Sequence, residues 1–412
     1  MDKIRQQKYA QMLIKVGVNL QPGQYLILQT IPEALPLAQD VTEEAFKAGA
    51  KDVIVFIEDP LINHIRAKYA TIETLREVPA WKKEQLEYYL KQDACQLGLM
   101  GSYPTLNNDV DGDKLLALNG ASNDVRNVIR KYIHQGTLQW TGTAVATQNW
   151  ANAVYPELSA IAALAALEDA LCKMVRVDLD SDVIANWDQH CDNLAKYSKK
   201  LNDCNFKSLH ITSELGTDIK MNLVEGHIWT SAGEMNEGAH AVSYVANMPT
   251  EEIFTDPDCF SVNGIAYASR PLMMSGKLVT DFNITFKDGY AVDCAASNNV
   301  EFLRDALFKN EGTRRLGEVA LVSKMSPINK MGKVFFNGLI DENAACHLAF
   351  GSSFPSCLKG GTTLSPEELI KHGVNVATSH NDFMIGTEKT KVVGIMHDNT
   401  EVVVMENGDF VI

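Results

Sequence analysis

The sequence has little positive charge and no long hydrophobic run. Its 412 residues include 37 lysines and arginines against 52 aspartates and glutamates, a formal net charge of -15. Because nucleic-acid binding depends on basic side chains that neutralise phosphates, we expect no DNA or RNA partner. The most apolar helical stretch, residues 157–175, is interrupted by Glu168 and Asp169. It is therefore predicted to be a buried helix, and no membrane span is expected.

Paired cysteines, an export signal and phosphate-binding motifs are also missing. None of the 8 cysteines forms a CxxC pair, which in a chain of this size indicates buried, reduced thiols. Residues 1–16 are amphipathic with scattered charges, so they lack the continuous apolar core of a signal peptide. Together these features predict a cytoplasmic protein. No GxGxxG or GxxxxGK[ST] motif is present, which excludes the usual dinucleotide and P-loop sites.

The first part of the chain alternates short apolar runs with helical spacing. With 46% hydrophobic residues, a chain of 412 residues is long enough to form two domains. The apolar runs lie at residues 25–30, 52–59, 95–103 and 139–147. Apolar strands that alternate with helices are typical of a parallel sheet covered on both faces. We therefore predict an α/β domain over residues 1–185.

Residues 186–412 have a different pattern, which favours hairpins. After a helical segment at 186–203, alternating strands flank turns at 215–218, 288–289, 398–399 and 407–408. The Asp288-Gly289 pair is suited to a type I′ turn. This region is predicted to be an α+β domain rich in antiparallel strands.

Four stretches of the second domain offer metal ligands. In "SHNDFMIGT", His380 and Asp382 would share one face of a strand and grip an ion together. A solvent-facing pair is the alternative. In "NMPTEEIFT", Glu251 and Glu252 follow Thr250, and a capped helix start with acidic residues in its first turn is the alternative.

The other two stretches carry Glu318 and His347. Glu318 directly precedes the apolar run 319–322, and a buried carboxylate there needs an ion, a hydrogen-bond donor or a proton to offset its burial. The alternative is a glutamate at the strand end that reaches solvent. His347 lies between small and apolar residues, a setting that also suits a hydrogen-bonded core histidine. Taken together, imidazoles and carboxylates without cysteine suit a catalytic Zn²⁺, Co²⁺ or Mn²⁺ site.

Four blocks carry a family resemblance: "NMPTEEIFT", "RRLGEVALV", "DENAACHLAFG" and "HNDFMIG", in that order. With "ATQNWANAVYPEL" of the first domain, they resemble the thermophilic-type metalloaminopeptidase family, which includes aminopeptidase T and aminopeptidase S. The resemblance implies a metal-dependent exopeptidase that releases N-terminal residues from short peptides. It also implies a homodimer and two divalent metal ions per chain. The implied ligands are Glu252, Glu318, His347, His380 and Asp382.

The chemistry expected of such a pair of ions is activation of water and polarisation of the scissile carbonyl. Asp382, with its short side chain beside His380, is our candidate for a bridging ligand. Glu251 is our candidate general base, although a helix first-turn acid remains the alternative.

One position departs from the family pattern. Phe354 stands where the family usually places a tyrosine near the metals, and a phenyl ring has no hydroxyl to donate or coordinate. Two other functions therefore remain open. One is a peptide-binding protein that has lost turnover, and the other is a metallohydrolase of dipeptides or other amides.

Overall fold

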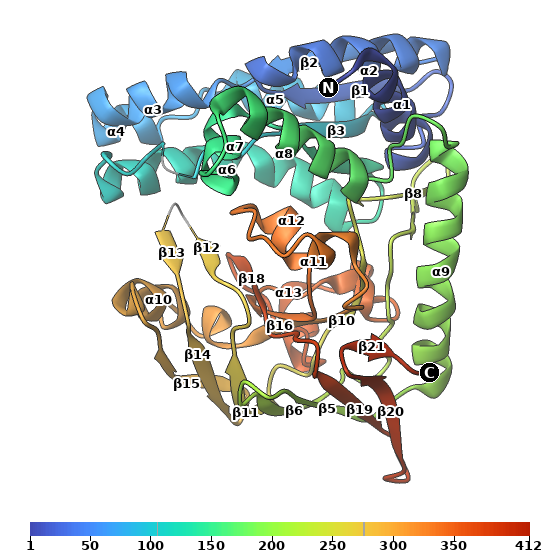
Figure 1. The fold of residues 1–412 in the computed structure, drawn as a ribbon, viewed down its shortest axis with the longest axis vertical. Coiled ribbons are helices and arrows are strands. Elements are labelled where there is room, and N and C mark those ends of the chain that lie inside the picture. The colour runs from blue at the N-terminus through green and yellow to red at the C-terminus, as the bar shows by residue number, and fades with distance from the viewer. Residues whose placement is uncertain (105, 275–276) are drawn as a thin grey trace. The chain divides into compact units, whose positions relative to one another are not determined.

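The computed structural model describes residues 1–104, 106–274 and 277–412 (Figure 1). The chain forms two compact units. The first unit comprises Met1–Gln189 and Gly233–Pro249, and the second comprises His190–Ala232 and Thr250–Ile412. The chain thus returns to the first unit after entering the second, whereas our prediction had a single crossing near residue 185.

The first unit contains a five-stranded parallel sheet. Its strands are β1 (Tyr25–Thr30), β2 (Asp52–Ile57), β3 (Cys95–Met100), β4 (Trp140–Ala144) and β9 (Asn247–Met248), in the order β2-β1-β3-β4-β9. Every neighbouring pair is parallel, as predicted for this part of the chain. The returning segment supplies β9, so residues far along the chain complete the sheet.

Helices cover this sheet. They are α1 (Lys3–Met12), α2 (Leu35–Lys47), α3 (Pro60–Tyr69), α4 (Ile72–Arg76), α5 (Ala80–Leu90), α6 (Gly112–His134), α7 (Gln148–Val154) and α8 (Ala160–Met174). Ile27 of β1 packs with residues of α5 and α6, while Leu26 and Leu28 point to the opposite face and are also fully buried. Both faces of β1 are therefore covered. Among the described residues, every helix is too short or too polar to cross a membrane.

The second unit contains an eight-stranded antiparallel sheet. Its strands are β5 (Ser208–Thr212), β6 (Asp218–Asn222), β11 (Asn263–Tyr267), β14 (Asn283–Lys287), β15 (Tyr290–Ala295), β19 (Lys391–Ile395), β20 (Glu401–Glu406) and β21 (Asp409–Phe410). The predicted hairpins are present. Asp288 and Gly289 join β14 to β15 with φ of 49° and 81°, as a type I′ turn requires.

A four-stranded antiparallel sheet lies in the same unit, with the order β10-β16-β17-β18. These strands are β10 (Glu252–Thr255), β16 (Leu316–Val322), β17 (His347–Gly351) and β18 (His380–Met384). The two sheets share one hydrophobic core, in which Leu209 and Ile219 of the larger sheet join Leu348 and Phe383 of the smaller one.

The remaining elements connect these sheets. The helices are α9 (Val183–Cys204), which enters the second unit from the first, and α10 (Val300–Leu307), α11 (Pro327–Lys330), α12 (Gly338–Glu342) and α13 (Pro366–Lys371). Two small hairpins are β7 (Glu234–Met235) with β8 (Ser243–Tyr244), and β12 (Leu272–Met274) with β13 (Lys277–Val279).

Candidate metal centre

The predicted metal ligands lie on one face of the four-stranded sheet. Four of them are each next in sequence to a residue of the shared core, namely Ile253, Val319, Leu348 or Phe383, and His380 lies two residues before Asp382 on the same strand. Since neighbouring residues of a strand point to opposite faces, the ligands point away from that core. The predicted ligands are Glu252 on β10, Glu318 on β16, His347 on β17, and His380 and Asp382 on β18. Thr250 begins no helix, because Glu252 opens a strand that pairs with β16.

The strand register brings these residues together. Glu318 lies opposite Ala349 of β17, and Ala349 lies opposite Asp382 of β18, so the three residues form one row across the sheet. The methyl group of Ala349 is the smallest side chain that keeps this strand regular, and it leaves space between the two carboxylates. In the adjacent row, His347 lies between Ala320 and Met384.

The donor atoms form two groups that share Glu318. One group is Glu252, Glu318 and His347, and the other is Glu318, His380 and Asp382, with the donor atoms of each group within 4.8 Å of one another. In the first group, Nε2 of His347 lies 3.1 Å from Oε2 of Glu252. In the second, Nε2 of His380 lies 3.0 Å from Oε2 of Glu318 and 2.9 Å from Oδ1 of Asp382. Glu318 thus belongs to both groups, whereas Asp382, our candidate for a bridging ligand, belongs to one.

Backbone carbonyls orient both imidazoles. Nδ1 of His347 lies 3.1 Å from the carbonyl oxygen of Ala345, and Nδ1 of His380 lies 2.6 Å from that of Ser352. A carbonyl only accepts hydrogen bonds, so Nδ1 carries the proton and Nε2 faces the carboxylates. This is how metal-binding histidines are usually held. The arrangement, with its nitrogen and oxygen donors, fits a divalent cation such as Zn²⁺, Co²⁺ or Mn²⁺.

The electrostatics of the metal-free centre favour a cation. Burial raises the pKa of Glu318 to about 7, although its hydrogen bond with His380 opposes this. Burial is the largest single influence on Asp382 and disfavours its ionised form, but the charge and hydrogen bond of His380, together with the charge of His347, outweigh it and lower the pKa of Asp382 to about 2. For His347, burial acts against the charged form, but Glu252 raises its pKa to about 10. Protons on the imidazoles thus balance the buried carboxylates.

Glu251, the predicted general base, belongs to neither group of ligands. Its backbone N–H donates to Oδ1 of the buried Asn343 at 2.6 Å, which fixes the approach to Glu252. Its carboxylate oxygen Oε1 lies 3.9 Å from Nε2 of His190. Glu251 directly precedes β10 and so lies outside the strand that carries Glu252.

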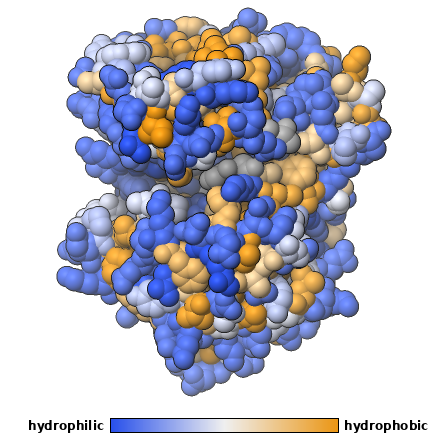
Figure 2. All heavy atoms as spheres, turned by 90° about the vertical axis from the view of Figure 1, so that its left-hand side faces the viewer, coloured by the Kyte–Doolittle hydropathy of each residue, from blue (hydrophilic) through white to orange (hydrophobic). Residues whose placement is uncertain are grey.

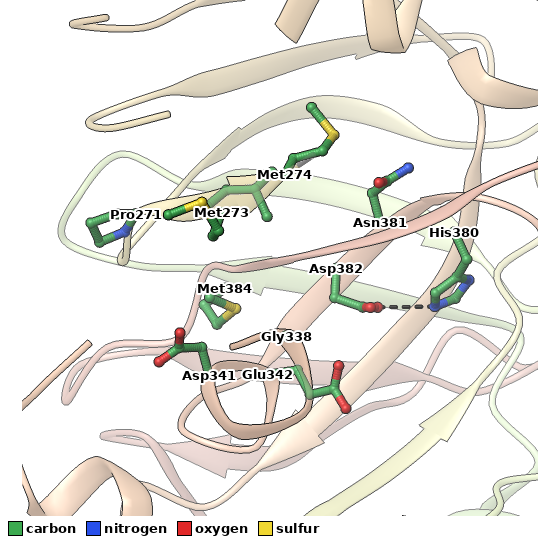
Figure 3. A pocket seen from close by; sticks show the side chains of 11 residues that line it. Pro271, Met273, Met274, Gly338, Asp341, Glu342, His380, Asn381, Asp382 and Met384 are labelled. Atoms are coloured by element: carbon green, nitrogen blue, oxygen red, sulfur yellow. Dashed lines mark ion pairs between the residues drawn. The ribbon is translucent and has the colours of Figure 1, made fainter. Parts of the chain in front are cut away.

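Sequence reasoning missed Glu342, at the end of α12. Glu342 lines the same pocket as His380 and Asp382 (Figure 3). Burial raises its pKa well above the ordinary value, and the charges of Asp382 and Glu252 raise it further. Its position five residues before His347, within one of the quoted blocks, was the only signal in the sequence.

Phe354 lies against a predicted ligand. Its ring centroid is 4.9 Å from that of His380 and 5.3 Å from that of Phe254. The backbone N–H of Phe354 donates to Oδ1 of Asp256 at 3.1 Å, and Asp256 is fully buried. Burial raises the pKa of Asp256 well above its usual range and so favours the neutral form of this carboxyl group. Phe354 therefore contributes an apolar contact to the His380 imidazole.

A sequence model of the thermophilic metalloprotease (M29) family matches residues 2–410. The chain belongs to this family. It is 37% identical to "Aminopeptidase PepS" of Streptococcus thermophilus and 35% identical to "Aminopeptidase T" of Thermus thermophilus, and each alignment covers 98% of both chains.

The fold of this M29 protein also matches that of a solved relative. The structure titled "Wild-type AmpT from Thermus thermophilus" superposes with a TM-score of 0.92 at 34% identity and covers 100% of both chains. These comparisons confirm the family and the fold class that were predicted from the sequence.

Proposed function

We propose that this M29 protein is a metal-dependent aminopeptidase that releases N-terminal amino acids from peptides. The observation that carries the proposal is the pair of ligand groups sharing Glu318 on one sheet face. The names of the relatives, aminopeptidases at 34–37% identity over nearly the whole chain, support the reaction.

The proposed ligand assignment follows the two groups. Glu252 and His347 would hold one ion, His380 and Asp382 the other, and Glu318 both. We propose two divalent ions, Zn²⁺, Co²⁺ or Mn²⁺, per chain. When bound, such ions lower the pKa of water and polarise a carbonyl group.

For proton transfer we propose Glu342 rather than Glu251. Glu342 shares a pocket with His380 and Asp382. Once positive charge neutralises the surrounding carboxylates, the pKa of Glu342 falls and its carboxylate accepts a proton from water and returns it to the leaving amine. Glu251, which lies beside His190, remains the alternative base, and substitution of each glutamate tests this choice.

The two other functions have less support. A peptide-binding protein without turnover does not require three carboxylates around two histidines, a set of donors that suits a catalytic divalent cation. A hydrolase of other amides uses the same chemistry, so it differs only in whether the free amine of the substrate is required.

We also propose a homodimer located in the cytoplasm. Large apolar side chains of the first unit are exposed on β2 and α3, namely Val55, Ile57, Leu61, Ile62 and Ile65. Figure 2 shows hydrophobic patches among hydrophilic residues on one face of the molecule. Such surface is usual at interfaces between subunits. The cytoplasmic location is supported by the eight cysteines, which form no disulfide bond in the part of the chain that the structure describes.

The decisive experiment is a substrate panel with metal-reconstituted protein. We expect release of one residue at a time from peptides with a free amine, no cleavage of N-acetylated peptides, and loss of activity with a chelator. His380→Ala should lose both bound metal and activity.

The matched control for that variant is His210→Ala. His210 pairs with Asp218 at 2.7 Å, but this pair lies on the larger sheet, away from the ligand groups. His210→Ala should keep metal and activity. Cleavage of blocked substrates, or full activity and metal content in His380→Ala, would contradict the proposal.

A further inference from the structure

A pocket with an apolar wall adjoins the ligand cluster. Its cavity volume is about 210 Å³. Its lining includes His380 and Asp382 as well as the apolar residues Pro271, Leu272, Met273, Met274 and Met384. Figure 3 shows the methionines of β12 and of the end of β18 on the side away from His380.

Strand geometry fixes this apolar wall relative to the ligands. His380, Asp382 and Met384 alternate along β18, so all three point to the same face. The apolar part of the pocket thus begins one step beyond Asp382. The backbone N–H of Ser269 donates to the carbonyl oxygen of Met384 at 2.7 Å, which holds the chain leading into β12 beside β18.

The acidic residues of the pocket do not face its apolar wall as free charges. Asp341 accepts hydrogen bonds from the backbone N–H groups of Phe335 at 2.8 Å and Asn337 at 3.1 Å. Its oxygens are therefore engaged in holding the 335–337 turn. In Figure 3, the carboxylate of Glu342 lies on the side of His380. Asp341 lies on the side of Met384 in Figure 3, and each of its oxygens already accepts a backbone hydrogen bond.

We propose that this pocket receives the side chain of the substrate's N-terminal residue and selects uncharged, apolar side chains such as those of leucine, methionine and phenylalanine. The proposal rests on the proposed aminopeptidase function. A volume of about 210 Å³ is below the roughly 300–1,000 Å³ of sites for drug-sized ligands, so it suits one side chain. Methionine side chains are flexible and polarizable, which lets the wall adapt to both linear and aromatic groups.

The test compares kcat/KM for aminoacyl p-nitroanilides on the metal-reconstituted wild type. Each buried CH₂ group is worth about fourfold, so leucine, with three more side-chain carbons, should exceed alanine by up to about 60-fold. Lysine and glutamate substrates should be poorer than alanine. A flat or charge-preferring series would overturn the proposal.

A variant pair then assigns the selectivity to the wall. Met273→Glu introduces a carboxylate, and we expect the ratio of lysine to leucine hydrolysis to rise at least tenfold, whereas Met273→Leu should leave the wild-type ratio within about threefold. An unchanged ratio in Met273→Glu would refute the role of this wall.

A binding measurement separates this proposal from that of the function. Calorimetry on the wild type should show tighter binding of leucinamide than of lysinamide, with the order weakened or reversed by Met273→Glu. If no substrate is hydrolysed yet this order holds, the proposed function fails and the pocket assignment stands. If hydrolysis occurs and neither measurement depends on the side chain, only the pocket assignment fails.

Discussion

Substituting Glu318 with glutamine should have opposite effects on the metal-free and metal-bound protein. Glu318 is only 3% exposed, and burial raises its pKa from 4.5 to about 7. A group whose pKa is higher in the folded state contributes stability at low pH that is lost as pH rises through the folded pKa. The contribution of Glu318 to the free energy of unfolding of the metal-free wild type should therefore fall as pH rises from about 4.5 to about 7.

The size of this loss follows from the shift in pKa. A shift from 4.5 to about 7 corresponds to roughly 3 kcal/mol, since one pKa unit is about 1.4 kcal/mol. Glutamine does not ionise, and its carbonyl oxygen still accepts a hydrogen bond from Nε2 of His380. We expect metal-free Glu318→Gln to be more stable than the metal-free wild type by up to about 3 kcal/mol at pH 8, and by little at pH 5.

Added metal should reverse the order. Ligand at a hundred times its Kd stabilises a folded protein by about 2.7 kcal/mol. The wild type should gain this amount for each ion, whereas Glu318→Gln, which lacks the carboxylate common to both groups, should gain much less. Glu318→Gln keeps two of the three candidate ligands in each group, so weak metal binding by this variant would still agree with the reasoning.

The assay is urea unfolding at pH 5 and pH 8, with chelator and with Co²⁺ or Zn²⁺. Glu388→Gln is the control, because Glu388 is an exposed turn residue of the same unit and should behave as wild type in all four conditions. The reasoning is refuted if metal-free Glu318→Gln is less stable than wild type at pH 8. It is equally refuted if metal stabilises both proteins to the same extent.

Four further substitutions test individual groups. Phe354→Tyr should raise kcat/KM about tenfold or more if a hydroxyl donor is useful beside the metals, and unchanged turnover and metal affinity would show that it is unnecessary here. Glu342→Gln should lower kcat by about 10²- to 10⁴-fold with metal content intact, whereas Glu251→Gln should change kcat by less than about threefold, and the opposite ranking would reassign the base. Burial raises the pKa of Asp341 to about 6, so its contribution to stability is lost as pH rises from about 3.8 through 6. Asp341→Asn should remove this slope in urea unfolding, and should cost about 1–3 kcal/mol at pH 4 because an acceptor for the Asn337 N–H is lost.

Local pattern predicted many elements of the fold. The hairpin at Asp288-Gly289 follows from the positive φ that this pair tolerates, and the common face of His380 and Asp382 follows from the period of a strand. Both features depend only on residues near one another in the sequence. The parallel sheet was predictable for the same reason, because each of its first four strands is an apolar run followed by a helix.

Features set by distant contacts were not predictable. At Thr250, the local sequence also suits a helix start, but pairing with β16 makes Glu252 the first residue of a strand. The apolar sequence of β2 is typical of a buried strand. In the structure, β2 is an edge strand, and its Val55 and Ile57 are 43% and 55% exposed. Glu318 belongs to both donor groups because β16 lies between β10 and β17 in the sheet. That strand order cannot be predicted from the sequence of any single strand.

The order of the four ligand-bearing strands also bears on how the protein folds. The candidate ligands are spread from Glu252 to Asp382 and come together only across the rungs of a completed sheet. In a zinc finger, by contrast, the ion itself drives folding of a short segment. Here an ion meets its full set of donors only after the sheet has formed, so metal should slow unfolding and leave the refolding rate almost unchanged. The metal centre would then stabilise the second unit after it has folded, rather than form part of its folding nucleus.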